Sequence, residues 1–234
     1  FDVSWFSYVL HAAIINCLLV IIIFYFFDKI GLKKIYSFLY TLSVSILAYP
    51  SVGTPFMDHH STIFSLISIV FFILAFLGKD KKFWFLSSLF LIFSFFSKQI
   101  PAAYILITFG ILILIYKIIL KNSVNKNIIY FFLGGSIGII IFLGLFLFNQ
   151  IPLNNFLIQY IYYPITIGEE RVSNMYFDLQ SIFLQFKFIY FSILPVILIA
   201  FFIMNKKINY ENKKDLLVIL SLISTFIIFI YSQL

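Results

Sequence analysis

Apolar residues occur in long runs separated by short polar breaks along the whole chain of 234 residues. A membrane hydrocarbon core about 30 Å thick is crossed by about 20 helical residues, so runs of this length predict membrane-spanning helices. We therefore expect an all-α, polytopic transmembrane bundle of about eight helices, forming a single domain over residues 1–234. The predicted spans are 4–27, 35–49, 61–78, 83–97, 100–116, 127–148, 183–204 and 216–234.

The composition supports a membrane protein. Apolar residues make up 63% of the chain and charged residues 11%, against roughly 25% charged in ordinary soluble domains. A soluble fold of this size could not bury so much apolar surface, which excludes a soluble enzyme and a disordered chain. Cys17 is the single cysteine, so an intrachain disulfide is excluded too. Because the chain starts at Phe1 and ends within an apolar run, we expect it to be part of a longer protein.

The lysines predict the orientation in the membrane, because basic residues concentrate in cytoplasmic loops. If the chain starts outside, 13 of the 16 basic residues lie inside, namely Lys29, Lys33, Lys34, Lys79, Lys81, Lys82, Lys117, Lys121, Lys126, Lys206, Lys207, Lys213 and Lys214. The net charge of +7 therefore reflects topology, and we expect no nucleic-acid partner. Richness in Ile, Phe, Lys and Asn favours a bacterial source and hence the inner (plasma) membrane.

The segment 83–116 is predicted to form two helices with a turn at Lys98. A single helix of 34 residues would be about 51 Å long, too long for one span. Placing the break at Ser97-Lys98-Gln99-Ile100-Pro101 also keeps the lysine asymmetry, and proline suits the first turn of a new helix. The helix 83–97 then measures only about 22 Å, so Lys98 and Gln99 are expected below the membrane surface.

Asp58, His59 and His60 follow the similarly short helix 35–49, on the same predicted side as Lys98. Together these residues predict an outward-facing polar cavity. Asp58 could act as a base, orient a hydroxyl or bind a metal. The alternative is that Asp58 or Ser61 only caps the next helix while the histidines lie among the headgroups. A recessed Lys98 suits a phosphate, and its alternative is to extend to the interface without a ligand.

The long extracytoplasmic loop, 149–182, carries several tyrosines and the cluster Glu169-Glu170-Arg171. It predicts either an aromatic anchor along the interface or a substrate-binding lid in which Arg171 contacts phosphate or sugar. Within the spans, His11 and Asn16 are predicted to hydrogen-bond neighbouring helices. Mid-span glycines predict close helix packing at Gly134, Gly135, Gly138 and Gly144.

The residues 45–49 leading to Met57-Asp58, followed by a span and by 93–101, resemble integral-membrane glycosyltransferases of the GT-C superfamily. The likeness is to the protein mannosyltransferase and lipid A aminoarabinose transferase branch. There, a loop reading roughly "yal-x-D" precedes a span, and a "GLAFLTKG" segment follows about 40 residues later. The resemblance covers about residues 5–120, and Ser94 and Gln99 stand where glycines are usual.

The resemblance implies a sugar donor linked to a polyprenyl phosphate, and transfer to a lipid, glycan or protein acceptor on the extracytoplasmic face. It implies that Asp58 belongs to the sugar or acceptor site, that the general base lies upstream of Phe1, and that Lys98 holds the donor phosphate. No cofactor is expected. The remaining residues that we assign to the substrate site are Gln99, His59, His60, Glu169, Glu170 and Arg171.

Other functions remain open at this point. The Asp-His-His triplet also resembles the second outside loop of archaeal oligosaccharyltransferases, which would make Asp58 and His60 ligands of a divalent metal. A transporter or flippase of lipid-linked sugars should place polar residues on broken helices near the membrane midplane. A polysaccharide polymerase or ligase should carry arginines and histidines in its large outside loop. The polar candidates here gather on one side, which favours the glycosyltransferase.

Cysteine labelling tests the predicted orientation. A cysteine introduced as Lys98→Cys should react with a membrane-impermeant thiol reagent added from outside. Protection from the external reagent, with reaction only from the inside, would overturn the topology.

Overall fold

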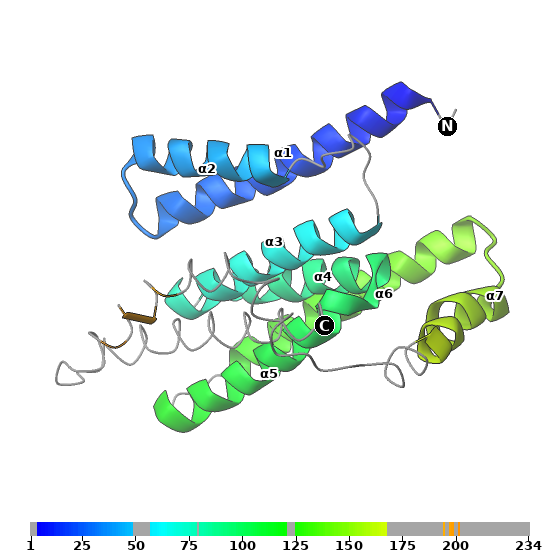
Figure 1. Ribbon diagram of the computed structural model, residues 1–234. Coiled ribbons are helices and arrows are strands. Elements are labelled where there is room, and N and C mark those ends of the chain that lie inside the picture. Colours follow the sequence, from blue (N-terminus) through cyan, green and yellow to red (C-terminus); the bar gives the residue numbers. More distant parts are fainter. Residues whose placement is uncertain are drawn as a thin grey trace, which may run out of the picture.

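The computed structural model describes residues 4–48, 57–78, 80–120 and 125–167, together with 194, 197, 198 and 201. Its named elements are all helical (Figure 1): α1 (Trp5–Lys29), α2 (Lys34–Ala48), α3 (Met57–Gly78), α4 (Lys81–Ser97), α5 (Gln99–Leu120), α6 (Asn125–Phe148), α7 (Leu153–Leu157) and the π-helical turn η1 (Ile158–Tyr162). The predicted spans 183–204 and 216–234 lie almost wholly outside the described residues, so the expected total of about eight helices stays a prediction.

Three of the described helices are long and apolar enough to cross a membrane, namely Trp5–Lys29, Met57–Leu77 and Asn127–Phe148. Lys34–Ala48 and Gln99–Ile115 are shorter apolar helices. The six predicted spans between residues 4 and 148 match α1 to α6 to within a few residues. The chain is accordingly an all-helical membrane protein over its described part.

The helix α3 begins at Met57, four residues earlier than the hydropathy pattern predicts. The predicted span 61–78 therefore starts too late, and Asp58, His59 and His60 belong to the first turn of α3. A carboxylate in a first turn lies at the positive end of the helix dipole, which stabilises this earlier start.

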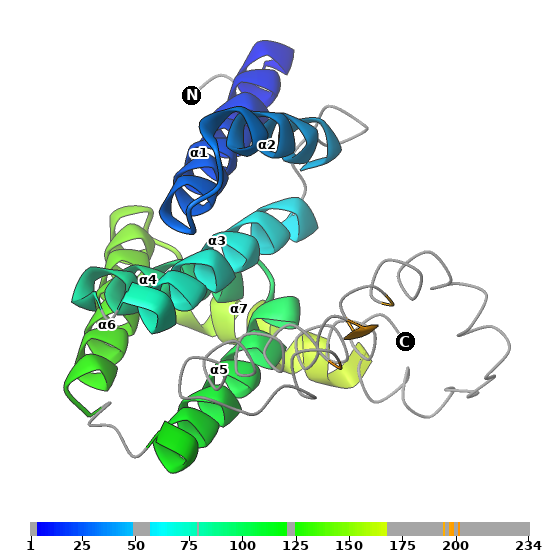
Figure 2. The same ribbon diagram turned by 90° about the vertical axis from the view of Figure 1, so that its left-hand side faces the viewer.

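The helices α1 to α6 alternate in direction (Figures 1 and 2). The α1–α2 hairpin lies on one side of α3 and α4, α5 lies on the other, and α6 packs along α4. The predicted break after Ser97 is present, because Lys98 is extended (φ −159°, ψ 135°) and Ile100 is non-helical (φ −98°, ψ 126°). Consequently α5 runs back against α4 (Figure 1).

Serine hydroxyls join α3 to α4 inside the bundle. The Oγ of Ser65 lies 2.7 Å from the Oγ of Ser94, which donates to the carbonyl of Ser61 at 2.9 Å. Farther along, the Oγ of Ser68 donates to the carbonyl of Ser87 at 2.7 Å. All five serines are buried. Lipid tails are as apolar as the side chains, so small residues and interhelical hydrogen bonds specify such an interface.

Close backbone approach joins α4 to α6 at two of the predicted glycines. A Cβ on Gly134 would lie 2.1 Å from the carbonyl oxygen of Phe85, and one on Gly138 would lie 2.9 Å from the Cβ of Ile92. The packing prediction is thus confirmed for Gly134 and Gly138. At Gly144, by contrast, a Cβ would meet nothing within 4 Å among the described residues.

His11 and Asn16 of α1 contact neighbouring helices as predicted. The amide Nδ2 of Asn16 donates to the carbonyl of Ser45 in α2 at 3.1 Å. The Nε2 of His11 lies 2.8 Å from the Nε2 of His60 in α3, so α1 is linked to both helices that pack on it.

Replacing Gly134 by alanine should destabilise the fold, because the added methyl group overlaps the backbone of α4. Overpacking of this kind costs about 1–3 kcal/mol. Thermal unfolding of the intact protein in detergent measures the loss. Gly144→Ala is the matched control on the same helix and should unfold no earlier than the wild type. Equal stability of the two variants would contradict the close α4–α6 packing.

Candidate functional site

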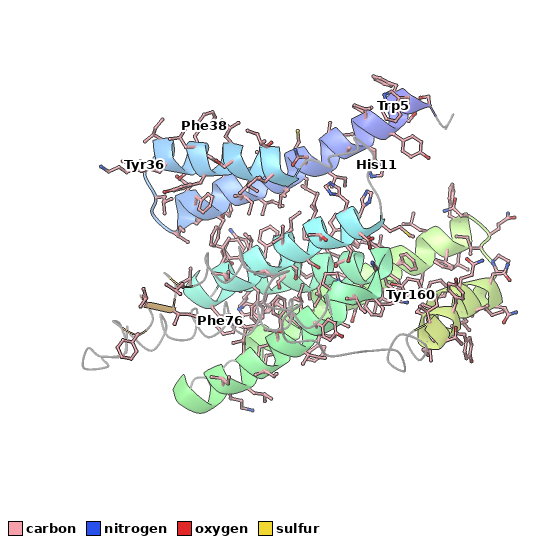
Figure 3. The ribbon with its side chains drawn as sticks, viewed as in Figure 1. Trp5, His11, Tyr36, Phe38, Phe76 and Tyr160 are labelled. Atoms are coloured by element: carbon pink, nitrogen blue, oxygen red, sulfur yellow. The ribbon has the colours of Figure 1, made fainter. Side chains whose placement is uncertain are left out.

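A pocket of about 810 Å³ opens at the end of the bundle where α1 begins. Its walls come from the first turn of α3, the α4–α5 turn, the end of α6 and the segment 151–164. That last segment contains α7 and η1 and packs across the end of the bundle, with Tyr160 labelled in Figure 3. The predicted site residues Asp58, Lys98 and Gln99 all line this pocket.

Asp58 and Lys98 form an ion pair between Oδ1 and Nζ, although they are 40 residues apart in sequence. The structure therefore places the predicted carboxylate and amine in one site, and Lys98 has a partner. Both side chains stay accessible, 68% for Asp58 and 49% for Lys98. An exposed pair of this kind contributes only about 0–1 kcal/mol to stability. The pair can therefore open without disturbing the fold.

The serine network sets the position of this ion pair. The backbone N–H of Lys98 donates to the carbonyl of Ser94 at 3.0 Å, and the carbonyl of Lys98 accepts from the Oγ of Ser61 at 3.2 Å. Ser61 lies one turn after Asp58 on α3. The same hydroxyl that joins the two helices thus holds Lys98 opposite the first turn of α3.

The sequence did not predict that Ser61 and Ser94 hold Lys98 in position. Capping of the helix by Asp58 or Ser61 was the alternative interpretation, but Ser61 lies in the second turn of α3, buried against α4. The available signal was the spacing of Ser61, Ser65 and Ser68, because residues three and four apart share one face of a helix. Polar side chains repeated on one face of an apolar helix predict an interhelical contact.

Tyr160 attaches the segment 153–167 to the α4–α5 turn through hydrogen bonds. Its hydroxyl donates to the carbonyl of Phe95, and its own carbonyl accepts from the Nε2 of Gln99. Its ring stacks on Phe156 with the ring centroids 4.9 Å apart. Burial raises the pKa of the Tyr160 hydroxyl, which therefore stays protonated at neutral pH and acts as a donor. The sequence predicted this tyrosine only as one of several in the loop 149–182, as part of an aromatic anchor or of a substrate-binding lid.

The two predicted histidines do not line the pocket. His60 faces His11 on α1, with the ring centroids 4.8 Å apart in an edge-on arrangement (His11 is labelled in Figure 3). The Nε2 of His59 is buried and has no hydrogen-bond partner among the described residues. Their assignment to the substrate site stays a prediction, and neither side chain belongs to the lining of this pocket.

The alternative metal site lacks a ligand set in the described part of the chain, where no three His, Cys, Asp or Glu side chains gather. Asp58 faces Lys98, whereas His60 faces His11. Glu169, Glu170 and Arg171 lie outside the described residues, so their place in the site stays a prediction.

No family model, no curated protein and no solved structure matches this chain. The likeness to GT-C enzymes therefore rests on the sequence motifs alone.

Tyr160→Phe should weaken the attachment of the segment 153–167, because the carbonyl of Phe95 loses the hydroxyl that it accepts from. One such hydrogen bond contributes about 0.5–1.5 kcal/mol. The loss should appear as a lower thermal midpoint in detergent and as faster proteolysis within this segment. Tyr162→Phe is the control, since Tyr162 is 63% exposed. The same effect in both variants would show that Tyr160 does not hold the segment.

Proposed function

We propose that the chain is part of a membrane glycosyltransferase of the GT-C type. It moves a sugar from a polyprenyl-phosphate-linked donor to a lipid, glycan or protein acceptor on the extracytoplasmic face of a bacterial plasma membrane. The observation that carries the proposal is the accessible ion pair of Asp58 and Lys98 inside the pocket at one end of the bundle.

Lys98 suits the phosphate of the donor. Its ammonium group is a compact charge, and the side chain lines the pocket while remaining half exposed. When the bond between the sugar and the phosphate breaks, negative charge develops on the phosphate oxygen, and a fixed cation beside it lowers the barrier. Lys98 thus binds the donor and stabilises the leaving group.

Asp58 gains a second role when the donor arrives. The incoming phosphate competes with the carboxylate for Lys98, and the weak surface pair opens at little cost. The released carboxylate can then accept a hydrogen bond from a hydroxyl of the sugar or of the acceptor. The ion pair therefore keeps both groups in place until the donor supplies a new partner for the lysine.

The shape of the pocket also suits a lipid phosphate. Its volume lies within the range of about 300–1,000 Å³ that is usual for small-molecule sites. Beside the polar groups it has apolar walls from Met57, Phe146 and Phe156. At the adjoining end of α6, Leu147 and Phe148 are highly exposed and offer an apolar path toward lipid for a prenyl chain.

The reaction requires no further reagent. An oxygen of the acceptor hydroxyl attacks the anomeric carbon, and the bond from that carbon to the phosphate oxygen breaks. The phosphate leaves with the electron pair beside Lys98. The hydroxyl proton passes to a carboxylate base, as the GT-C resemblance implies, while Asp58 orients the reacting hydroxyls.

Transfer assays on the full-length protein with a polyprenyl-linked sugar test the proposal. Lys98→Ala and Asp58→Asn should each lower kcat/KM about tenfold or more, because a hydrogen bond to a charged group contributes about 1.5–3 kcal/mol. Lys98→Ala should also raise the KM for the donor.

Lys82→Ala is the matched control for these assays. Lys82 forms a similar exposed ion pair with Asp80 at 3.2 Å, at the opposite end of α4. Its removal should leave transfer unchanged. Wild-type turnover in both Lys98→Ala and Asp58→Asn would refute the site.

A further inference from the structure

Two amide side chains of the segment 153–167 face the pocket beside the ion pair. Asn155 lies on α7 and Gln159 on η1, and both line the pocket together with the ring-bearing neighbours Phe156 and Tyr160. Residues four apart on a helix lie about 5–6 Å from one another on the same face. The segment therefore presents a pair of amides, side by side, to whatever occupies the pocket.

The other polar side chains of the pocket already have partners within the protein. Ser97 donates to the carbonyl of Phe93 at 2.9 Å, and Gln99 donates to the carbonyl of Tyr160. The hydroxyl of Tyr160 is bound to the carbonyl of Phe95, and Asp58 is paired with Lys98.

Asn155 and Gln159 differ from this group. Within the described ranges, neither amide side chain makes a hydrogen bond to the protein. Their donors and acceptors are therefore available to a ligand without the loss of an internal contact.

The chemistry of an amide indicates which part of a ligand it binds. Each amide offers two N–H donors and a carbonyl acceptor, and it carries no charge. A phosphate would prefer Lys98, and a prenyl chain would prefer the apolar walls. Hydroxyl groups both donate and accept, so a pair of amides matches neighbouring hydroxyls of a sugar.

The attachment of Tyr160 makes this recognition specific. Tyr160 follows Gln159 directly and is held by two hydrogen bonds to the α4–α5 turn, the same turn that carries Lys98. The amides therefore keep a constant position relative to the phosphate-binding lysine. A constant position allows one arrangement of hydroxyls to be favoured over another.

We propose that Asn155 and Gln159 are specificity-determining residues that hydrogen-bond the hydroxyls of a sugar headgroup whose phosphate lies at Lys98. This inference rests on the proposed glycosyltransferase function, because it places the donor in the same pocket. It assigns the sugar to the segment 153–167 and the phosphate to the α4–α5 turn.

Binding of short lipid phosphates to the full-length protein in nanodiscs tests the assignment. The probes are farnesyl phosphate and its glucose, mannose and galactose conjugates. The wild type should bind at least one conjugate more tightly than farnesyl phosphate. Asn155→Leu and Gln159→Met keep the approximate size of each side chain. Each should weaken that conjugate about two- to tenfold, the value of one hydrogen bond, and leave farnesyl phosphate unchanged.

Asn154→Leu is the control, because Asn154 is exposed on α7 and does not line the pocket. It should change neither affinity. Equal wild-type affinity for all four probes would overturn the inference, and so would an equal loss for both kinds of probe in Asn155→Leu and Gln159→Met. The first result would mean that the pocket does not recognise the sugar. The second would mean that the substitutions act only through the structure.

The proposed function fails in a different way. If Lys98→Ala leaves the affinity for farnesyl phosphate unchanged, the phosphate site is wrong. Selective loss of sugar binding in Asn155→Leu and Gln159→Met would still support the amides as a sugar site in that case. The two proposals are therefore tested by separate variants and separate probes.

Discussion

Hydrogen bonds from buried serines hold α3 against α4, and the placement of Asp58 opposite Lys98 depends on them. Ser61 contacts both Ser94 and the backbone of Lys98, so it fixes the axial register of α3 relative to α4. Such bonds are decisive in a lipid environment, where burial of apolar surface does not distinguish one helix contact from another. A shift of one turn, about 5.4 Å, would separate Asp58 from Lys98.

The helix α4 connects this register to the rest of the bundle. Its opposite face accepts α6 at Gly134 and Gly138, where the absence of side chains permits close approach. Its end turns at Lys98 into α5, and the same turn receives the segment 153–167 through Tyr160. One helix therefore positions a lysine, a hairpin and a pocket wall at the same end of the bundle.

At the end of the bundle that carries the pocket, the charged pair and the histidines occupy different places. A charged pair of little energetic value lies in the open pocket, whereas the histidines connect α3 to α1 away from it. The accessible pair suits exchange with an anionic ligand, and the two available amides suit hydroxyls. This division agrees with a ligand that has a phosphate, a polyol and an apolar chain.

The sequence by itself determined where α1 to α6 lie and where the chain turns at Lys98, because hydropathy and helix length act locally along the chain. It also predicted Asp58 and Lys98 on one side, through the lysine asymmetry and the short helices around them. Only the tertiary structure decided which side chains meet. The rotation of each helix about its axis places His60 against His11 and Ser61 against Ser94, and it brings Tyr160 to Gln99. That rotation follows from packing among all the helices, which no local pattern encodes.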